Sequence, residues 1–163
     1  MNEGNTTSTK IISVVNGDEI GVFRNSTHMY YQDYNGNGAW DGAVIDRAYN
    51  FGTVGDIGVS GDWNANRITE IGVVRGNYAW YMDYNGDGVW SGIPADRIYG
   101  LGQPGDMFVT GDWNGDNTTE TGVVHGSHTW NVDYNGDGIW SGTPADRIYS
   151  LGQPGDIMVT GKW

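Results

Sequence analysis

The chain has 163 residues, of which 20 are acidic, 8 are basic and 28 are glycine, and its formal net charge is −12. This acidic balance argues against nucleic acid as a partner, since proteins that bind nucleic acids carry basic stripes. The chain has no cysteine and no apolar stretch long enough for a signal peptide or a membrane span, so we expect neither disulfide bonds nor membrane insertion.

The first third of the chain predicts a polar leader followed by four short strands. Residues 1–10 are polar, and we expect a flexible leader there. Ile11–Val15 and Glu19–Arg24 predict two strands, and Asn16-Gly17 between them suits a tight type I′ turn. A third and a fourth strand are predicted at Met29–Tyr34 and Arg47–Phe51. No segment has the apolar periodicity of a helix, which favours an all-β protein.

The same pattern returns twice with a step of 50 residues. The decapeptide Asp33–Gly42 reappears as Asp83–Gly92 and as Asp133–Gly142. The predicted strands return with it. First strands are expected at Ile57–Trp63, Met107–Trp113 and Ile157–Trp163, and second strands at Glu70–Arg75 and Glu120–His125. Third strands are expected at Ala79–Tyr84 and Thr129–Tyr134, and fourth strands at Arg97–Leu101 and Arg147–Leu151. Gly21, Gly72 and Gly122 interrupt the second strands, and we expect an adjoining sheet to approach the backbone closely there.

Four short strands in each repeat of about 50 residues are typical of a β-propeller blade. We predict three four-stranded blades, at about residues 11–52, 53–102 and 103–152, and one extra terminal strand within residues 153–163. Three blades do not close a ring, and an extra strand leaves an open edge. We therefore expect a homo-oligomer, with a six-bladed dimer that could exchange the terminal strand as the favoured form. The alternative is that the chain is a fragment of a larger propeller.

The loops between the third and fourth strands carry oxygen ligands at alternate positions. Calcium loops of the EF-hand type place such ligands at positions 1, 3, 5 and 9 and glycine at position 6. The three loops offer Asp33, Asn35, Asn37 and Asp41, then Asp83, Asn85, Asp87 and Ser91, and then Asp133, Asn135, Asp137 and Ser141. The alternative is that Asn-Gly-Asp-Gly serves here only as turn chemistry, without a metal.

The loops between the first and second strands form a second candidate family. One offers Asp112, Asn114, Asp116 and Glu120, and the other offers Asp62, Asn64, Asn66 and Glu70. The Asp112 loop is the first candidate because it has three carboxylates, whereas the Asp62 loop has two asparagines and Arg67 beside them. Oxygen ligands from Asp and Asn suit Ca²⁺, while zinc prefers His or Cys, so we expect calcium in at least one loop.

Over about residues 11–163 the sequence resembles the FG-GAP (VCBS-like) repeats of integrin-α-type β-propellers. The resemblance is carried by Phe51-Gly-Thr-Val-Gly-Asp56, Leu101-Gly-Gln-Pro-Gly-Asp106 and Leu151-Gly-Gln-Pro-Gly-Asp156, each followed by an apolar stretch and, in the first two, by Gly-Asp-Trp-Asn. It implies a calcium site in the loops of Asp112 and Asp62, although asparagine replaces aspartate at several ligand positions and glycine is absent at position 6. Such propellers include adhesion modules, lectins and surface-protein domains, so the resemblance also implies an extracellular or cell-surface location.

The eight tryptophans fall almost wholly on repeat positions. These are Trp40, Trp90 and Trp140, then Trp63, Trp113 and Trp163, and then Trp80 and Trp130. We expect them to pack between blades, because large rings bury much area in small cores. The alternative is that Trp40, Trp90 and Trp140 form exposed platforms that stack on sugar rings. His125, which stands where the sister units have arginine, is interpreted as a surface substitution.

Nothing in the sequence favours catalysis. There is no cysteine nucleophile, no Gly-X-Ser-X-Gly elbow and no phosphate-binding loop. The acids are copied from unit to unit, whereas catalysis usually depends on one unique constellation; a carboxylate pair for glycoside hydrolysis is left open. We predict a non-enzymatic, calcium-supported propeller module that binds a glycan or a protein. The alternative is a self-assembling repeat scaffold without a small ligand.

Overall fold

The computed structural model describes residues 17–163. The expected leader at residues 1–10, the expected strand Ile11–Val15 and Asn16 of the predicted turn lie outside the described residues. Between residues 17 and 163 the chain is all-β, as expected, with three antiparallel sheets of three or four strands. This part of the chain contains no helix, and so none that could cross a membrane.

Each sheet is a meander in which every strand pairs with the next one along the chain. The first sheet contains β1 (Gly21–Arg24), β2 (Met29–Gln32) and β3 (Arg47–Asn50). The second contains β4 (Ile57–Gly61), β5 (Glu70–Arg75), β6 (Ala79–Met82) and β7 (Arg97–Gly100). The third contains β8 (Met107–Gly111), β9 (Glu120–His125), β10 (Thr129–Val132) and β11 (Arg147–Ser150). The strands lie where the repeat predicts them, although several end one or two residues early.

The strand expected at Ile157–Trp163 is not formed. These residues have no strand assignment, although their sequence has the same pattern as β4 and β8. They still lie beside β8, because the Thr160 hydroxyl donates a hydrogen bond to the carbonyl oxygen of Thr110 at 2.8 Å. A strand needs a backbone partner as well as a suitable sequence, and among residues 17–163 this segment has none.

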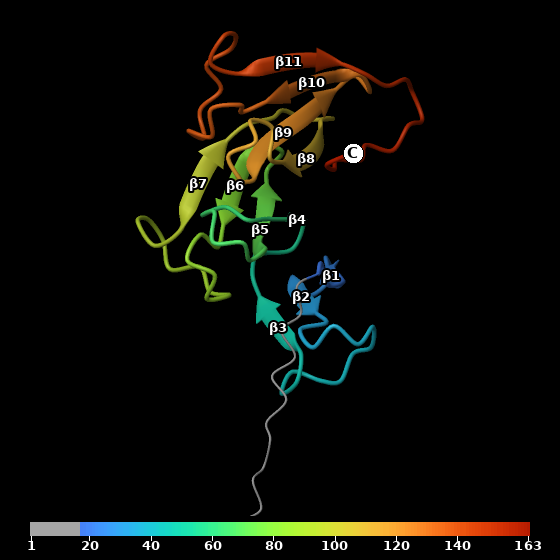
Figure 1. The fold of residues 1–163 in the computed structure, drawn as a ribbon, viewed down its shortest axis with the longest axis vertical. Coiled ribbons are helices and arrows are strands. Elements are labelled where there is room, and N and C mark those ends of the chain that lie inside the picture. Colours follow the sequence, from blue (N-terminus) through green and yellow to red (C-terminus); the bar gives the residue numbers. More distant parts are fainter. Residues whose placement is uncertain (1–16) are drawn as a thin grey trace, which may run out of the picture.

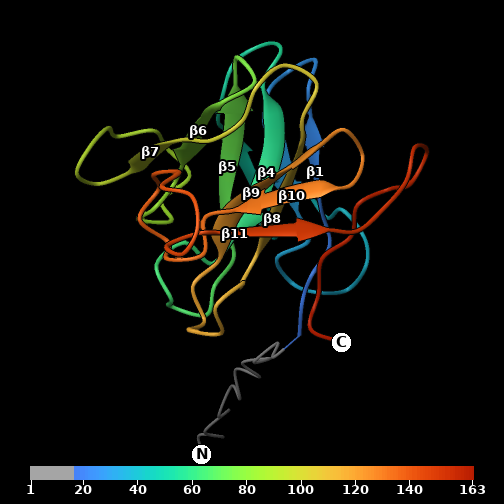
Figure 2. The same ribbon diagram turned by 90° about the horizontal axis from the view of Figure 1, so that it is seen from above.

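The three sheets follow one another along the long axis of the molecule (Figure 1). The first and third sheets lie at opposite ends, with the second sheet between them, and successive sheets are turned relative to each other (Figure 2). The first strands of neighbouring sheets, β4 and β8, contact each other. Residues 17–163 therefore form an open stack of sheets rather than a closed ring.

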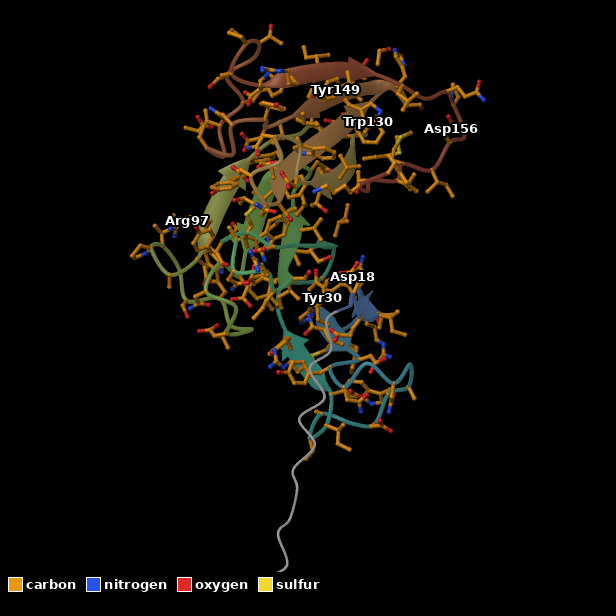
Figure 3. All side chains as sticks on the ribbon, in the orientation of Figure 1. Asp18, Tyr30, Arg97, Trp130, Tyr149 and Asp156 are labelled. Carbon is orange, nitrogen blue, oxygen red and sulfur yellow. The ribbon has the colours of Figure 1, made fainter. Side chains whose placement is uncertain are left out.

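The core lies between the sheets. Tyr30 on β2 (Figure 3) packs with Phe51, Ile71 and Val73 where the first sheet faces the second. A larger cluster of Trp63, Val74, Trp80, Met82, Leu101 and Val123 joins the second sheet to the third. Trp130 packs with Val109 and Val124 at the outer end of the stack. Each sheet thus buries its apolar side chains against a neighbour, as repeat proteins do.

The glycines of the second strands are covered by tryptophan from the same sheet. A Cβ added at Gly72 would lie 3.5 Å from the Trp63 ring, and one added at Gly122 would lie 3.4 Å from the Trp113 ring. Both tryptophans stand two residues after the first strand of the same sheet. At Gly72 an adjoining sheet also approaches the backbone, as expected, because the Tyr30 hydroxyl of the first sheet donates a hydrogen bond to the Gly72 carbonyl oxygen. A Cβ at either glycine would be in ordinary contact with the ring and closer to a valine of the first strand, at 3.2 Å from Val59 for Gly72 and 3.1 Å from Val109 for Gly122.

Candidate metal centre and a pocket between two sheets

Asp112, Asp116 and Glu120 come together in the loop that joins β8 to β9. One carboxylate oxygen from each lies within 4.8 Å of the others, and within residues 17–163 no other group of three Asp, Glu or His side chains does so. The strand pairing explains the placement, since Gly111 and Glu120 are opposite one another and close the loop at its base. Asp112 and Asp116 are exposed, and Glu120 is 3 % exposed.

The backbone of this loop folds around the Asp112 carboxylate. Asp112 accepts hydrogen bonds from the N–H groups of Gly115, Asp116 and Asn117 at 2.6, 3.1 and 3.1 Å. Asn117 occupies the position where EF-hand loops have glycine, and it adopts a φ of 74°. Asparagine tolerates this left-handed conformation, so the absence of glycine does not prevent the loop from forming.

Glu120 is the most perturbed acid of the loop. Its carboxylate accepts hydrogen bonds from the Trp113 N–H at 2.7 Å and from the Asn114 amide at 3.0 Å. Burial raises the pKa of Glu120 to about 8, and the negative charges of Asp116 and Asp112 add to this effect. No salt bridge to these acids is formed within residues 17–163. A buried acid with uncompensated negative neighbours fits a hard cation, and a donor set of three carboxylates and one amide suits Ca²⁺.

The loop of Asp62, Asn64, Asn66 and Glu70 has the same shape and a weaker donor set. Asp62 accepts hydrogen bonds from the N–H groups of Asn66 and Arg67, and Glu70 accepts one from Trp63. The amides of Asn64 and Asn66 both donate to Glu70, at 3.2 and 2.8 Å. With two carboxylates, one of them already held by two amides, this loop is the less favourable cation site.

In the loops between the third and fourth strands, the first aspartate holds its own backbone. Asp33, Asp83 and Asp133 are buried, and their carboxylates accept hydrogen bonds from the N–H groups of Gly38, Gly88 and Gly138 at 2.6, 2.7 and 2.8 Å. The remaining carboxylates pair with side-chain amides: Asp41 with Asn35 and Asn37, Asp87 with Asn85, and Asp137 with Asn135. These loops bring no three carboxylates together. Their hydrogen bonds are those expected of turns, and the metal hypothesis for these loops stays a prediction.

Sequence reasoning missed a second set of buried acids that closes the same loops. Asp46, Asp96 and Asp146 each accept two backbone N–H groups, one from the start of the loop and one from its middle. In the second sheet these donors are Tyr84, at 3.1 Å, and Ser91, at 2.6 Å. The sequence does show that this aspartate recurs at a constant distance from the first aspartate of each loop. That spacing matches no metal-binding pattern, so it did not point to a role in the loop.

A pocket of about 290 Å³ lies between the second and third sheets. Its lining includes Gln103, Asp106, Asn131 and Trp140. The equivalent place in the second sheet is filled, because the Arg75 guanidinium stacks on the Tyr81 ring at 4.4 Å and Trp90 packs edge-on against the same ring.

The pocket exists because the third unit departs from the repeat at two positions. Asn131 replaces the tyrosine and His125 replaces the arginine of that stack, and both side chains are shorter. His125 keeps the pairing with the aspartate that Arg75 makes with Asp56, since its Nδ1 atom lies 2.8 Å from a carboxylate oxygen of Asp106. Trp140 therefore lines a pocket that also contains amide and carboxylate groups. The interpretation of His125 as a mere surface substitution overlooked that both changes fall on one stack.

A comparison with protein-family models, with curated proteins and with solved structures found no match to this chain. The resemblance to FG-GAP repeats therefore stays a prediction.

Proposed function

We propose that the chain is a non-enzymatic, calcium-supported binding module whose three sheets are blades of a β-propeller. The meander topology of the sheets, their step of 50 residues and the contact between β4 and β8 support the propeller assignment. The observation that carries the calcium assignment is the approach of Asp112, Asp116 and Glu120 to within 4.8 Å of one another. By resemblance, the expected location is extracellular or at the cell surface.

Asp112, Asp116 and Glu120 would hold the ion. The Asn114 amide donates to Asp116 and Glu120 in the calcium-free chain, so it would have to turn to offer its oxygen as a further ligand. Calcium supplies positive charge at a place where the folded chain has buried a carboxylate beside two others. The same residues fix the hairpin loop, since Asp112 and Glu120 also accept backbone N–H groups. Binding is therefore expected to stabilise the junction of β8 and β9 rather than to activate a substrate.

The ligand proposed for this module is a carbohydrate bound in the pocket beside Trp140. An indole ring offers a flat apolar surface, and Asn131, Gln103 and Asp106 offer groups that can hydrogen-bond sugar hydroxyls. The pocket belongs to one unit only, so each chain would bind one sugar residue there. Avidity would come from association of several chains.

A glycan array probed in calcium and again in EDTA tests this function. We expect binding to a defined set of glycans in calcium, and its loss in Trp140→Ala. The matched control is Trp90→Ala. It changes the same repeat position in the second unit, where side chains fill the equivalent pocket, so this variant should still bind the glycans. Calcium is tested separately by calorimetric titration, with Asp116→Asn expected to weaken the affinity. Hydrolysis of any glycan would contradict the non-enzymatic assignment.

A self-assembling scaffold is the second candidate, because large apolar side chains are exposed at both ends of the stack. Ile20 and Val22 are exposed at one end, and Ile157, Val159 and Trp163 at the other. A defined oligomer that binds no glycan on the array would favour this candidate. A monomer in sedimentation experiments would instead favour a fragment of a larger propeller.

A further inference from the structure

Residues 157–163 continue the spatial series of β4 and β8. The Thr110 hydroxyl donates a hydrogen bond to the carbonyl oxygen of Ser60 at 3.0 Å, and the Thr160 hydroxyl donates one to the carbonyl oxygen of Thr110 at 2.8 Å. Ser60, Thr110 and Thr160 occupy the same position in successive repeats. The terminal segment therefore lies where the first strand of a fourth sheet would lie.

In the second and third sheets, the first strand is completed by a tryptophan that covers the glycine of the second strand. Trp63 lies over Gly72, and its indole N–H donates to the carbonyl oxygen of Ile71 at 3.2 Å. Trp113 lies over Gly122 in the same way and donates to the carbonyl oxygen of Thr121 at 3.3 Å. Trp63 is 3 % exposed and belongs to the core cluster between the second and third sheets, while Trp113 is half-buried.

The terminal segment has the same side chains with nothing over them in the described part of the chain. Trp163 is 96 % exposed, and its ring lies beside its own Gly161, as the Trp113 ring lies beside Gly111. Val159 is 65 % exposed, whereas Val109 at the same repeat position is 7 % exposed. The segment has the surface of β8 and no second strand to cover it.

β1 has the complementary surface. Glu19-Ile-Gly-Val22 repeats Glu70-Ile-Gly-Val73, so β1 is a second strand in sequence. It is the edge strand of its sheet in the described structure, and a Cβ added at Gly21 would meet only Tyr31 and Gln32 within 4 Å. Ile71 and Val73 are buried in the second sheet, while Ile20 and Val22 are exposed. Within residues 17–163, β1 has neither the neighbouring strand nor the tryptophan that cover β5.

We propose that residues 157–163 of one copy pair antiparallel with β1 of a second copy, so that Trp163 covers Gly21 and its indole N–H donates to the carbonyl oxygen of Ile20. This interface rests on the propeller assignment of the proposed function and names the partner that would extend the ring. The register follows from that of the second sheet, in which Val59 faces Gly72 and Gly61 faces Glu70. Val159 would face Gly21, and Gly161 would face Glu19.

A second copy fits this edge better than the same chain does. The terminal segment is held beside β8, whereas β1 belongs to the first sheet at the other end of the stack (Figure 1). Ile11–Val15 could pair with β1 within one chain, but that sequence has no Gly-X-Trp and so has no ring to place over Gly21. Two copies joined at both ends would present six sheets.

Cysteine cross-linking tests the register directly, because the chain contains no cysteine. Ile20 and Thr160 would face each other, as Ser60 faces Ile71 and Thr110 faces Thr121. Both are exposed, so Ile20→Cys and Thr160→Cys should leave the fold intact. The two variants are mixed, oxidised mildly and separated by size, at about 0.15 M salt or above to screen the repulsion between acidic copies.

The expected result is a covalent dimer of one Ile20→Cys chain and one Thr160→Cys chain. Ile20→Cys mixed with Ile157→Cys is the off-register control and should give little cross-link. The double variant Thr110→Cys with Thr121→Cys should form the same contact within one chain, and it calibrates the oxidation. The proposal would be overturned if the amount of covalent dimer did not exceed that of the off-register control. It would also be overturned if Ile20→Cys were protected within a monomer, since that result would favour pairing with Ile11–Val15.

Trp163→Ala gives an independent measurement by sedimentation. The ring is exposed in the single chain, so its removal should leave the fold and the calcium titration unchanged while it weakens dimerisation about thirtyfold or more, the effect of a buried interface tryptophan. Tyr78→Ala, another exposed aromatic, is the control and should not change dimerisation. An unchanged dimer in Trp163→Ala would overturn the interface, while normal calcium and glycan binding in that variant would leave the proposed function standing.

Discussion

Replacing Glu120 by glutamine should remove most of the pH dependence that this loop gives to stability. In the folded, calcium-free chain the pKa of Glu120 is raised from 4.5 to about 8. The unfolded chain releases the proton near pH 4.5, and the folded chain keeps it to about pH 8. Between these values the folded state binds more protons, so the free energy of unfolding falls as the pH rises.

The magnitude follows from the size of the pKa shift. One group contributes a slope of at most about 1.4 kcal/mol per pH unit, which amounts to roughly 3–5 kcal/mol across the window. Glutamine resembles the protonated acid in shape and does not titrate, so Glu120→Gln should lack this slope. The difference between the two proteins isolates Glu120, because the other acids are common to both.

Urea denaturation in EDTA at pH 5, 6, 7 and 8 measures the effect. We expect the curves of unfolding free energy against pH for the original chain and for Glu120→Gln to converge near pH 5 and to separate by pH 8. Calcium at about 100 times its dissociation constant should then stabilise the original chain at pH 8 by about 2.7 kcal/mol. Glu70→Gln is the comparison variant: burial raises the pKa of Glu70 as well, so this variant should also flatten the curve, and it should keep the stabilisation by calcium because its loop has the weaker donor set. A constant offset between Glu120→Gln and the original chain at every pH would refute the reasoning.

Three further substitutions test the packing by urea denaturation. Tyr30→Phe should destabilise the chain by about 1–3 kcal/mol, because a backbone N–H of β4 donates to the buried Tyr30 hydroxyl at 3.0 Å, whereas Tyr31→Phe loses only an exposed bond and should cost less. Gly58→Ala should cost about 1–3 kcal/mol, since its Cβ would lie 2.6 Å from a phenylalanine ring of β1, and Gly100→Ala, with nothing within 4 Å, is its control. Asp96→Asn should cost about 1–3 kcal/mol, because one of the two backbone N–H groups bonded to this buried carboxylate would face an amide N–H. Equal effects of a variant and its control, or no effect at Asp96, would contradict these assignments.

The strands could be predicted because each is a local pattern that the repeat confirms twice. The exception, residues 157–163, has the same pattern as Met107–Gly111 and forms no strand. The difference is the absence of a partner strand in the described chain, which no property of those seven residues reports. Sequence therefore predicted the capacity to form a strand, while pairing decided whether the strand exists.

The candidate site could be predicted only in part, for a similar reason. The loops that begin at Asp83 and at Asp112 have the same alternation of oxygen side chains. In the Asp83 loop, Asp96 accepts a hydrogen bond from the backbone N–H of Tyr84, 12 residues earlier in the chain. In the Asp112 loop, Glu120 at the start of β9 brings a third carboxylate close to Asp112 and Asp116. Contacts at that separation depend on the sheet. The pocket beside Trp140 was predictable in principle, from the two departures from the repeat that fall on one stack.

The hydrogen bonds from Thr110 to Ser60 and from Thr160 to Thr110 connect successive repeats in the same way, which affects how the number of repeats can change in evolution. Each joint between sheets is made by residues that recur at a step of 50, so duplication or loss of one whole unit leaves the remaining joints chemically unchanged. An insertion within a strand would instead shift the residues of that strand out of register with its neighbours. Descendants of this sequence can therefore lengthen or shorten by whole units at small risk to folding, and a change confined to one unit, as at His125 and Asn131, can give that unit a new role.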